Sequence, residues 1–482
     1  MHWRFILKII GVLTFFFGLT MIFPLLVGLY YSDGSLIPLL KSMVITVATG
    51  LILYLIFRKA EADTISQREG MAIVTVGWAA VGLFGAIPFY LGDAQFTLTD
   101  AVFESVSGFT TTGSSILTDI EGLSPGLLIW RSFIQWLGGM GIIVLSIAIL
   151  PFLGVGGMQL YKAEVPSPVP DKLKPRIRDT AMILWKVYAL FTVAETLLLM
   201  VGGMTFFDSL NHAFTTMPTG GFSTKNASVA HFDSVYIDSV IILFMLLAGI
   251  NFSLHYQLLK GRPLALWKDS ECRFYLAMCL VLTLVVGADI YRTVYADAGQ
   301  ALRYAAFQVV SIVTTTGYAT ADYELWPGMS QIIIFLCMFV GASAGSTGGG
   351  MKCLRIMLCF KYCYKELFSM IHPRAVSHIK IGGKTVPEDV VRSVLGFLAL
   401  YMVLFALSTI LLAGTGVDFV TALGAVAATL GNIGPGFGMV GPVENFAQIP
   451  YWGKWLLSWC MLLGRLEIYT FIIIVVPEFW RK

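Results

Sequence analysis

Thr110-Thr111-Thr112-Gly113 is the first of four polar tips that each follow a moderately apolar stretch and contain a key glycine. The other three are Met217-Pro218-Thr219-Gly220, Thr314-Thr315-Thr316-Gly317 and Asn432-Ile433-Gly434. Successive tip glycines lie 107, 97 and 117 residues apart. Glycine takes a positive φ without steric cost, so the carbonyl oxygens of a tip can turn inward and replace the water around a bare cation. The near-regular repeat therefore predicts one ion pore built from four quarters.

The composition indicates an integral membrane protein. Hydrophobic residues make up 57% of the 482 residues and charged residues only 13%, whereas a soluble domain carries about 25% charge. The net charge of +3 says little as a total, but the placement of the charges is informative. The seven cysteines form no CxxC pair and most lie in apolar stretches, so we expect neither structural disulfides nor a metal site built from them.

Ten stretches are long and apolar enough to cross a bilayer, which takes about 20 residues. They lie near 5–30, 36–57, 70–91, 126–151, 181–203, 237–260, 273–291, 329–358, 389–412 and 452–477. We expect the first to be a helix, because no small-residue cleavage site of a signal peptide accompanies it. Four shorter segments lie near 99–109, 207–216, 301–313 and 418–430. These cannot cross a bilayer, so they are predicted to be re-entrant half-helices, which are tolerated only where protein or water covers them.

Basic residues set the predicted topology. Of the 32 lysines and arginines, 22 fall in the stretches 4–8, 58–68, 162–178, 260–273, 361–392 and 481–482. The loops on the opposite side hold few, namely Lys225, Arg292, Arg303 and Lys454. By the positive-inside rule, both termini and the basic stretches are cytoplasmic. The four tips then follow half-helices that enter from the other side. The basic stretch 361–384 meets either anionic lipid headgroups or a soluble partner.

The tips carry the chemistry of a site for an alkali cation. A half-helix aimed at the pore centre points its C-terminal carbonyl groups, roughly half a negative charge, at a cation. The carbonyl and threonine hydroxyl oxygens of the tips are hard ligands that suit such an ion. Four glycine and threonine turns in ordinary loops are the alternative interpretation. The combination of each tip with a half-helix favours stacked rings of oxygen.

Several other stretches are as distinctive as the tips. They are Gln135-Trp136-Leu137-Gly138-Gly139-Met140-Gly141, Leu153-Gly154-Val155-Gly156-Gly157-Met158-Gln159-Leu160-Tyr161, Gly345-Ser346-Thr347-Gly348-Gly349-Gly350 and Gly464-Arg465-Leu466-Glu467. With these stretches the chain resembles the Trk/Ktr/HKT superfamily of potassium transporters, and within it the bacterial Trk-type membrane subunit. The resemblance covers essentially all 482 residues.

The resemblance implies an all-α polytopic membrane protein with two leading transmembrane helices and four helix–pore-loop–helix repeats around one central pore. The corresponding units are 1–62 for the leading helices and 63–178, 179–270, 271–384 and 385–482 for the four repeats. It also implies potassium uptake across the bacterial inner membrane, a homodimer with one pore per subunit, and a cytoplasmic TrkA-like regulatory ring that binds NAD or ATP. A sodium- or proton-coupled potassium symporter, from the Ktr or HKT branches, is the alternative.

The resemblance also assigns a selectivity filter. Carried over, its potassium-binding positions are Thr111, Thr112, Gly113, Thr219, Gly220, Gly221, Thr315, Thr316, Gly317, Asn432, Ile433 and Gly434. The fourth tip departs from the threonine-rich pattern, and Gly431 offers a register offset by three. No tip has the full TVGYG sequence of potassium channels, which predicts a weaker preference for potassium over sodium.

The run from Gly341 to Gly350 interrupts an otherwise apolar stretch. Each glycine costs a helix about 1 kcal/mol relative to alanine, so a regular helix is not expected there. An unwound segment at membrane depth must line water or be buried, and below a filter it would form a gate. The resemblance supports a gate formed by Gly345, Ser346, Thr347, Gly348, Gly349 and Gly350. Close packing of helices through small residues is the alternative.

Arg465 lies inside the apolar run from Trp455 to Val476. An arginine at this depth is expected to face water or an opposite charge. Glu467 is two residues away and so on another helix face, which makes it an unlikely partner. We expect Arg465 to face the pore below the filter and to hold the gate, as the resemblance also implies. An ion pair between helices is the alternative.

We expect no enzyme. Gly341-Ala342-Ser343-Ala344-Gly345 matches the nucleophile-elbow pattern, but no strand–turn–helix setting or nearby histidine accompanies it. The same glycines followed by Lys352 lack the GK[ST] of a phosphate loop. The six histidines show no metal-ligand spacing. The chain is therefore expected to have no catalytic residue, to bind no nucleotide and no nucleic acid, and to carry potassium as its transported ion. A receptor-like or enzymatic membrane protein is the disfavoured class.

Overall fold

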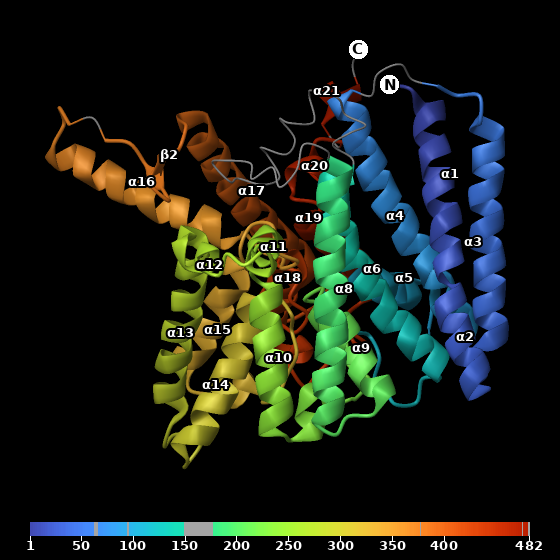
Figure 1. Cartoon of the computed structure of the whole chain (residues 1–482), viewed down its shortest axis with the longest axis horizontal. Coiled ribbons are helices and arrows are strands. Elements are labelled where there is room, and N and C mark those ends of the chain that lie inside the picture. The colour runs from blue at the N-terminus through green and yellow to red at the C-terminus, as the bar shows by residue number, and fades with distance from the viewer. Residues whose placement is uncertain (62–65, 94–95, 149–176, 376, 475, 481–482) are drawn as a thin grey trace.

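Long apolar helices run side by side through the protein and place both ends of the chain at one edge (Figure 1). The computed structural model describes residues 1–61, 66–93, 96–148, 177–375, 377–474 and 476–480. The distinctive stretch 153–161 and most of the basic stretch 162–178 lie outside the described residues. At the shared edge the rings of Trp3 and Trp480 stack with their centroids 5.4 Å apart. The two termini therefore lie on the same side, as the charge pattern predicts.

Three leading helices precede a pattern that recurs four times. The leading helices are α1 (Trp3–Thr20), α2 (Ile22–Tyr31) and α3 (Leu36–Phe57). Each recurrence, here called a quarter, has a long helix, a short helix that ends at a polar tip, and a returning helix. The first quarter contains α4 (Gln67–Gly92), α5 (Leu98–Phe109) and α6 (Pro125–Ala148). The second contains α8 (Ile177–Val201), α9 (Phe206–Thr216), η2 (Ser228–Phe232), α10 (Val235–Ala248), α11 (Phe252–Leu259) and α12 (Leu264–Lys268).

The third and fourth quarters follow the same order. The third contains α13 (Ser270–Ile290), α14 (Ala298–Val313), η3 (Tyr323–Leu325), α15 (Gly328–Val340) and α16 (Cys353–Ile371). The fourth contains α17 (Glu388–Ala413), α18 (Phe419–Leu430), η4 (Gly438–Val440), α19 (Tyr451–Arg465), α20 (Tyr469–Ile472) and α21 (Pro477–Trp480). Between them, β1 (Lys380–Ile381) pairs with antiparallel β2 (Lys384–Thr385). This hairpin, which the sequence pattern did not predict, turns through Gly382 and Gly383, both with positive φ.

The four predicted half-helices are confirmed as helices α5, α9, α14 and α18, with ends within three residues of those expected. Each begins with a side-chain cap, because a threonine or aspartate oxygen accepts a backbone N–H of the first turn. The capping residues are Thr97, Thr205, Asp297 and Asp418. Ten of the twelve residues of α5 are buried. These short helices therefore lie inside the protein, where their C-terminal carbonyl groups face the tips and accept several of the tips' backbone N–H groups.

Six helices in the described part of the chain are long and apolar enough to span a membrane, or seven if one bent pair counts as a span. They include the predicted spans of α1–α2, α3, α4, α8, α13 and α17. The predictions of continuous spans at 237–260 and 452–477 are wrong, because the helices there break after Ala248, with a bend of 103° to α11, and after Arg465. The stretch 329–358 also breaks, after Val340, as the glycines from Gly341 to Gly350 predict. A hydropathy window misses the first two breaks because it averages over side chains and ignores the backbone.

Glycines let the returning helices approach the half-helices closely. A Cβ added to Gly138 of α6 would overlap the carbonyl oxygen of Phe109, the last residue of α5. A Cβ added to Gly464 of α19 would likewise overlap the carbonyl oxygen of Leu430, the last residue of α18. Small residues are the usual means of close helix packing in membranes. The returning helices therefore hold the half-helix ends, and with them the tips, in place.

Candidate functional site

The four tips share one backbone conformation. In the first, Thr111 has φ 51° and Gly113 has φ 85°. The same pair of left-handed residues, two positions apart, recurs at Thr219 and Gly221, at Thr315 and Gly317, and at Asn432 and Gly434. A positive φ is uncommon for a residue other than glycine. Its presence at the same place in all four quarters indicates a repeated structural unit.

These dihedral angles shift the alignment of the second tip with the other tips by one residue. The sequence pattern aligned Gly220 with Gly113 and Gly317, but the backbone aligns Gly221 with them. Gly220 instead matches Thr112, since its N–H donates to the carbonyl of Thr215 at 2.8 Å as that of Thr112 donates to Ser107 at 2.9 Å. Thr316 and Ile433 make the equivalent bonds to Ser311 and Ala428, each at 2.8 Å. Two adjacent glycines cannot be told apart by spacing alone.

The tips contact one another in a closed ring. A Cβ added to any of three tip glycines would overlap the carbonyl oxygen of a residue in the next tip, and at the fourth it would lie 3.0 Å from that oxygen. The four pairs are Gly113 with Gly220, Gly221 with Thr316, Gly317 with Ile433, and Gly434 with Thr112. Each quarter contacts the next in the same way, and the fourth contacts the first. The ring brings oxygen atoms from four distant segments to one place.

The side chains at the tips are buried and add polar atoms to the ring. The hydroxyls of Thr110 and Thr112 lie 2.7 Å apart, and those of Thr314 and Thr316 lie 2.8 Å apart. The fourth tip, without threonine, joins the first because Asn432 Nδ2 donates to Thr112 Oγ1 at 2.8 Å. The hydroxyl oxygen of Thr111 has no hydrogen-bond partner in the described part of the chain. It is thus an available hard ligand beside the ring.

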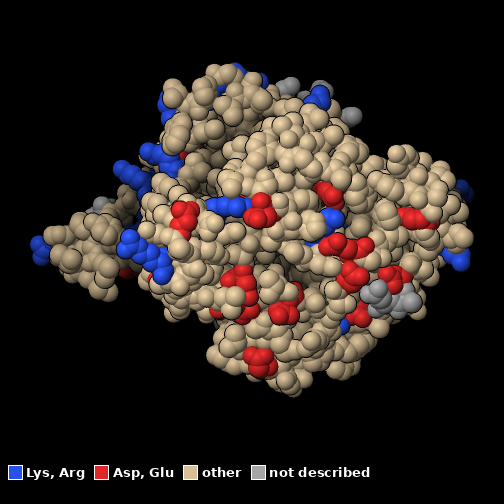
Figure 2. Space-filling view, turned by 90° about the horizontal axis from the view of Figure 1, so that it is seen from below, with Lys and Arg blue, Asp and Glu red and all other residues tan. Residues whose placement is uncertain are grey.

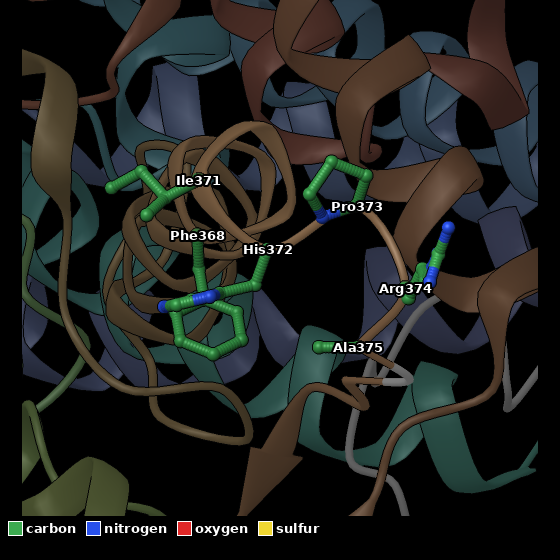
Figure 3. Close-up of a pocket in the computed structure, with 6 residues that line it drawn as sticks. All are labelled: Phe368, Ile371, His372, Pro373, Arg374 and Ala375. Atoms are coloured by element: carbon green, nitrogen blue, oxygen red, sulfur yellow. The ribbon is translucent and has the colours of Figure 1, made fainter.

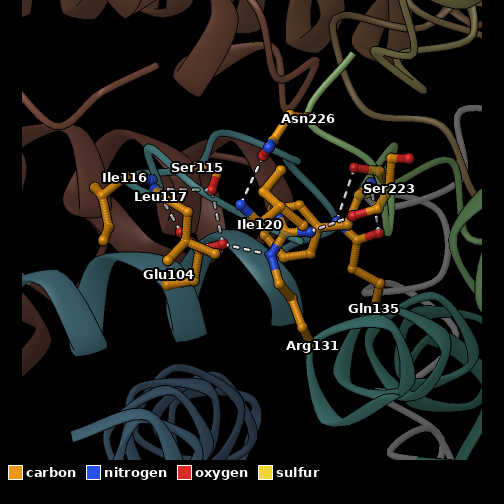
Figure 4. Close-up of polar contacts among 11 residues, drawn as sticks. Glu104, Ser115, Ile116, Leu117, Ile120, Arg131, Gln135, Ser223 and Asn226 are labelled. Atoms are coloured by element: carbon orange, nitrogen blue, oxygen red, sulfur yellow. Dashed lines mark hydrogen bonds and ion pairs between the residues drawn. The ribbon is translucent and has the colours of Figure 1, made fainter. Parts of the chain in front are cut away.

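A buried ion pair between α5 and α6 supports the segments that follow the first two tips (Figure 4). Arg131 Nε of α6 donates to Glu104 Oε1 of α5 at 2.6 Å, and neither side chain is more than 2% exposed. Glu104 also accepts the N–H of Ile116, at 3.0 Å, in the segment after the first tip. Arg131 Nη1 donates to the carbonyl of Ser223, at 2.9 Å, in the segment after the second tip. Glu104 therefore anchors α5 both to α6 and to the segment after the first tip.

Arg131 was missed by sequence reasoning. Its place within an apolar run, from Leu127 to Ile134, is the signal that would have found it, since a buried arginine needs a partner. Gln135, one helical turn on, donates from Nε2 to the carbonyl of Gly220 at 2.7 Å and accepts from the N–H of Phe222 at 3.2 Å. Both side chains of α6 therefore support the second tip.

The segments that follow the tips are tied together and rich in acid. The N–H of Phe446 donates to Ser115 across the fourth and first quarters, and that of Ala230 to Ala319 across the second and third. These segments, 114–124, 222–234, 318–327 and 435–450, hold six acidic residues and one lysine. On the face opposite the termini, aspartate and glutamate side chains gather around a hollow (Figure 2). This face attracts cations.

The segment that joins α15 to α16, residues 341–352 and here called the loop, packs against three tips. Thr347 Oγ1 donates to the carbonyl of Met217 at 2.9 Å, and the N–H of Gly349 donates to Thr315 Oγ1 at 2.6 Å. A Cβ on Gly349 would lie 2.5 Å from the carbonyl oxygen of Gly431. The loop is non-helical and most of its residues are buried. It therefore lies against the second, third and fourth tips.

Arg465, the last residue of α19, holds this loop. Its Nη1 donates to the carbonyl of Thr347 at 2.7 Å, and the side chain is 5% exposed. Within the described residues its Nε and Nη2 have no hydrogen-bond partner. The ion pair nearby is a different one, in which Arg355 of α16 binds Glu467 at 2.5 Å. Glu467 is therefore not paired with Arg465, in agreement with the helix spacing.

Other features of the described residues do not bear on the site. One surface pocket lies at the far end of α16, lined by Phe368, Ile371, His372, Pro373, Arg374 and Ala375 (Figure 3), and it includes no residue of the tips or the loop. Among the described residues, no group of three or more histidine, cysteine or acidic side chains is arranged to hold a metal. The oxygen ring is the feature suited to an ion.

Comparisons with known proteins agree over the whole chain. A family model described as "TrkH: Cation transport protein" matches residues 38–482. The chain is 44% identical over 485 residues to the Trk system potassium uptake protein TrkH of Halomonas elongata and 43% identical over 486 residues to that of Escherichia coli K12. Both comparisons cover 100% of each chain. The crystal structure of the potassium transporter TrkH from Vibrio parahaemolyticus matches with a TM-score of 0.91, at 39% identity and 100% coverage of both chains.

Replacement of Gly317 by alanine tests the ring. The new Cβ would overlap the carbonyl oxygen of Ile433 as well as strain the positive φ. Gly416→Ala is the matched control, because Gly416 has φ 96° and open space around it, so only backbone strain of about 1 kcal/mol is added. In vesicles containing the purified protein, we expect cation flux to fall at least about tenfold for Gly317→Ala and to stay near normal for Gly416→Ala. Equal flux in both variants would contradict the ring.

Arg131→Met should destabilise the protein by about 3–5 kcal/mol, because it leaves a buried carboxylate without its cation. The double variant Arg131→Met, Glu104→Gln should recover most of this loss. As a control, Asp233→Asn removes an 82% exposed partner of Arg303 and should cost less than about 1 kcal/mol. Thermal unfolding in detergent ranks the four proteins. If Arg131→Met alone were as stable as the wild type, the ion pair would not brace the tips.

Proposed function

The chain belongs to the TrkH family of cation transport proteins, and from that premise we propose that it takes up potassium ions across a bacterial inner membrane. The printed names of its relatives describe potassium uptake and a potassium transporter. In this proposal the chain is the membrane subunit, with one pore at the centre of the four quarters. The protein is not an enzyme, since the family transports cations.

The closed ring of tips is the observation that carries the proposal. Potassium must shed its water to pass a narrow filter, and closely set carbonyl and hydroxyl oxygens can replace that water. Four half-helices end at the ring and point their C-terminal carbonyl groups toward it, which adds negative potential for a cation. We assign ion binding to Thr111–Gly113, Thr219–Gly221, Thr315–Gly317 and Asn432–Gly434.

The charge on the outer face supports entry of cations from that side. The segments after the tips hold six acidic residues against one lysine, and acidic side chains gather around a hollow on the face opposite the termini (Figure 2). A cleft lined by one sign of charge raises the local concentration of the opposite ion. With the termini on the cytoplasmic side, the direction from this face past the ring is uptake.

We propose further that the loop is the gate. It contacts three tips through Thr347 and Gly349, on an unwound segment that a membrane tolerates only inside protein. Arg465 binds the loop carbonyl of Thr347 and places a positive charge near the path of the ion, where it opposes a cation. Opening then requires the loop to leave the tips.

The proposed assembly is a homodimer with a cytoplasmic nucleotide-binding ring of the TrkA type. The relatives are named as components of a Trk system, which supports a partner. The basic stretch 361–384 includes the C-terminal part of α16, which extends away from the bundle (Figure 1). It offers charge to lipid headgroups or to a soluble partner.

Vesicles containing the purified chain test the substrate. We expect flux of potassium to exceed that of sodium, because the ring replaces the hydration shell of the larger ion at less cost. Equal permeability to the two ions would refute the assignment of potassium. The same vesicles decide between passive flow and coupling: a reversal potential that shifts with a proton or sodium gradient would establish the symporter instead.

Deletion of residues 345–350 tests the gate. With the loop shortened, we expect potassium flux to rise several-fold while the preference for potassium is retained, since the ring is untouched. Arg465→Ala should also raise flux, by up to about tenfold, because a like charge near the path costs a cation on the order of 1 kcal/mol. Arg392→Ala, which changes an exposed arginine of α17, is the matched control. An unchanged rate in the deletion variant would rule the gate out.

A further inference from the structure

The two ends of the loop, near Gly341 and Cys353, lie side by side, and this place is here called the neck. The N–H of Met351 donates to the carbonyl of Phe339 at 3.3 Å, and that of Cys353 to the carbonyl of Ala342 at 3.0 Å. Cys353 Sγ also contacts the carbonyl of Gly341 at 3.2 Å. The residues that reach the tips, Thr347 and Gly349, lie between these two ends. Any contact that fixes the neck therefore fixes how far the loop reaches.

Glu271, the second residue of α13, binds both sides of the neck through one oxygen. Its Oε1 accepts the N–H of Ala344 at 2.7 Å and the N–H of Leu354 at 3.1 Å. Leu354 lies in the first turn of α16. This helix has no side-chain cap, and its first turn contains no acidic residue. Helix N-termini need an acceptor and favour negative charge. Glu271 supplies both from another helix, with only 8% of its surface exposed.

The charges around the loop divide into two groups. Lys352 and Arg465 donate to loop carbonyls, those of Gly348 and Thr347. Glu271 alone of the described acidic side chains accepts backbone N–H groups from the loop and the start of α16, whereas Glu467 pairs with the side chain of Arg355. Asp269, two residues before it, instead caps α13 by accepting the N–H of Cys272 at 2.7 Å. One carboxylate thus holds the neck while two cations hold the part that reaches the tips.

The segment 252–271, from the start of α11 to the second residue of α13, contacts the loop at both ends. At its start, the N–H of Phe252, the first residue of α11, donates to the carbonyl of Gly345 at 3.1 Å. At its end stands Glu271, after α12 and Asp269. The loop also binds the break between α10 and α11, because the N–H of Ser343 donates to the carbonyl of Gly249 at 3.0 Å. Residues 252–271 therefore connect to the loop at both ends.

We propose that Glu271 is a positioning residue that latches the loop against the tips and couples it to the segment 252–271. A displacement of α11 and α12 would draw Glu271 away from Ala344 and Leu354 and withdraw the loop from the tips. The part of this segment from residue 260 onward lies by the predicted topology on the cytoplasmic side, where it is open to a regulator. This proposal rests on the gate proposed above and adds the contact that controls it.

Glu271→Gln tests the latch, because it keeps an oxygen at the neck but removes the charge. In vesicles without any partner, we expect the ratio of open to closed protein to rise about tenfold, since a charged acceptor binds N–H groups more strongly than an amide. Glu271→Ala should open the pore further. Asp269→Asn makes the same change of charge two residues away, without a loop contact, and should leave the ratio as in the wild type. The preference for potassium over sodium should be unchanged in all three.

The 345–350 deletion separates the latch from a general structural role. In that background Glu271→Gln should have no further effect, because no loop remains to be held. A deletion that raises flux together with a Glu271→Gln variant that does not would overturn the latch and leave the gate standing. A deletion without effect would overturn both. An equal fall in flux from Glu271→Gln with and without the loop, in protein that elutes as a single species, would show that Glu271 only supports the fold.

Discussion

The structure depends on the close approach of four backbone turns, each with a positive-φ glycine against a carbonyl oxygen of the next turn. No side chain larger than hydrogen fits at Gly113, Gly221 or Gly317 without overlap. The contact is backbone to backbone, so it is repeated at the fourth tip, Asn432-Ile433-Gly434, which has no threonine. Polar backbone at membrane depth is tolerated only when it is buried in protein or lines water, and the half-helices and returning helices provide that burial.

The same constraint accounts for the broken helices. The helices that return in the second, third and fourth quarters break after Ala248, Val340 and Arg465, beside the tips. Each break frees backbone groups that need partners, and the loop supplies several of them, as in the bond from Ser343 to Gly249. The loop is thus paired with the breaks as well as with the tips. Its position is set by hydrogen bonds to backbone and to charged side chains, which suits a segment with two positions.

Sequence predicted the local features well and the distant partners poorly. The half-helices were predicted to within three residues because each is a short apolar stretch that ends at a polar tip with a glycine. The second tip was misaligned by one residue, since Gly220 and Gly221 are adjacent and only the backbone dihedral separates them. Partners far apart in sequence, such as Arg131 with Ser223 and Glu271 with Ala344, leave no local pattern. The breaks after Ala248 and Arg465 were missed because apolarity does not report backbone breaks, whereas the glycine run from Gly341 to Gly350 revealed the third.

Anomalous diffraction from crystals grown with thallium, a heavy ion of potassium-like size, tests the central claim most directly. We predict peaks on the axis enclosed by the four tips, within coordination distance of oxygens at Thr111–Gly113, Thr219–Gly221, Thr315–Gly317 and Asn432–Gly434. Peaks found only elsewhere, or none in crystals soaked at a concentration that supports thallium flux, would contradict an ion-binding ring.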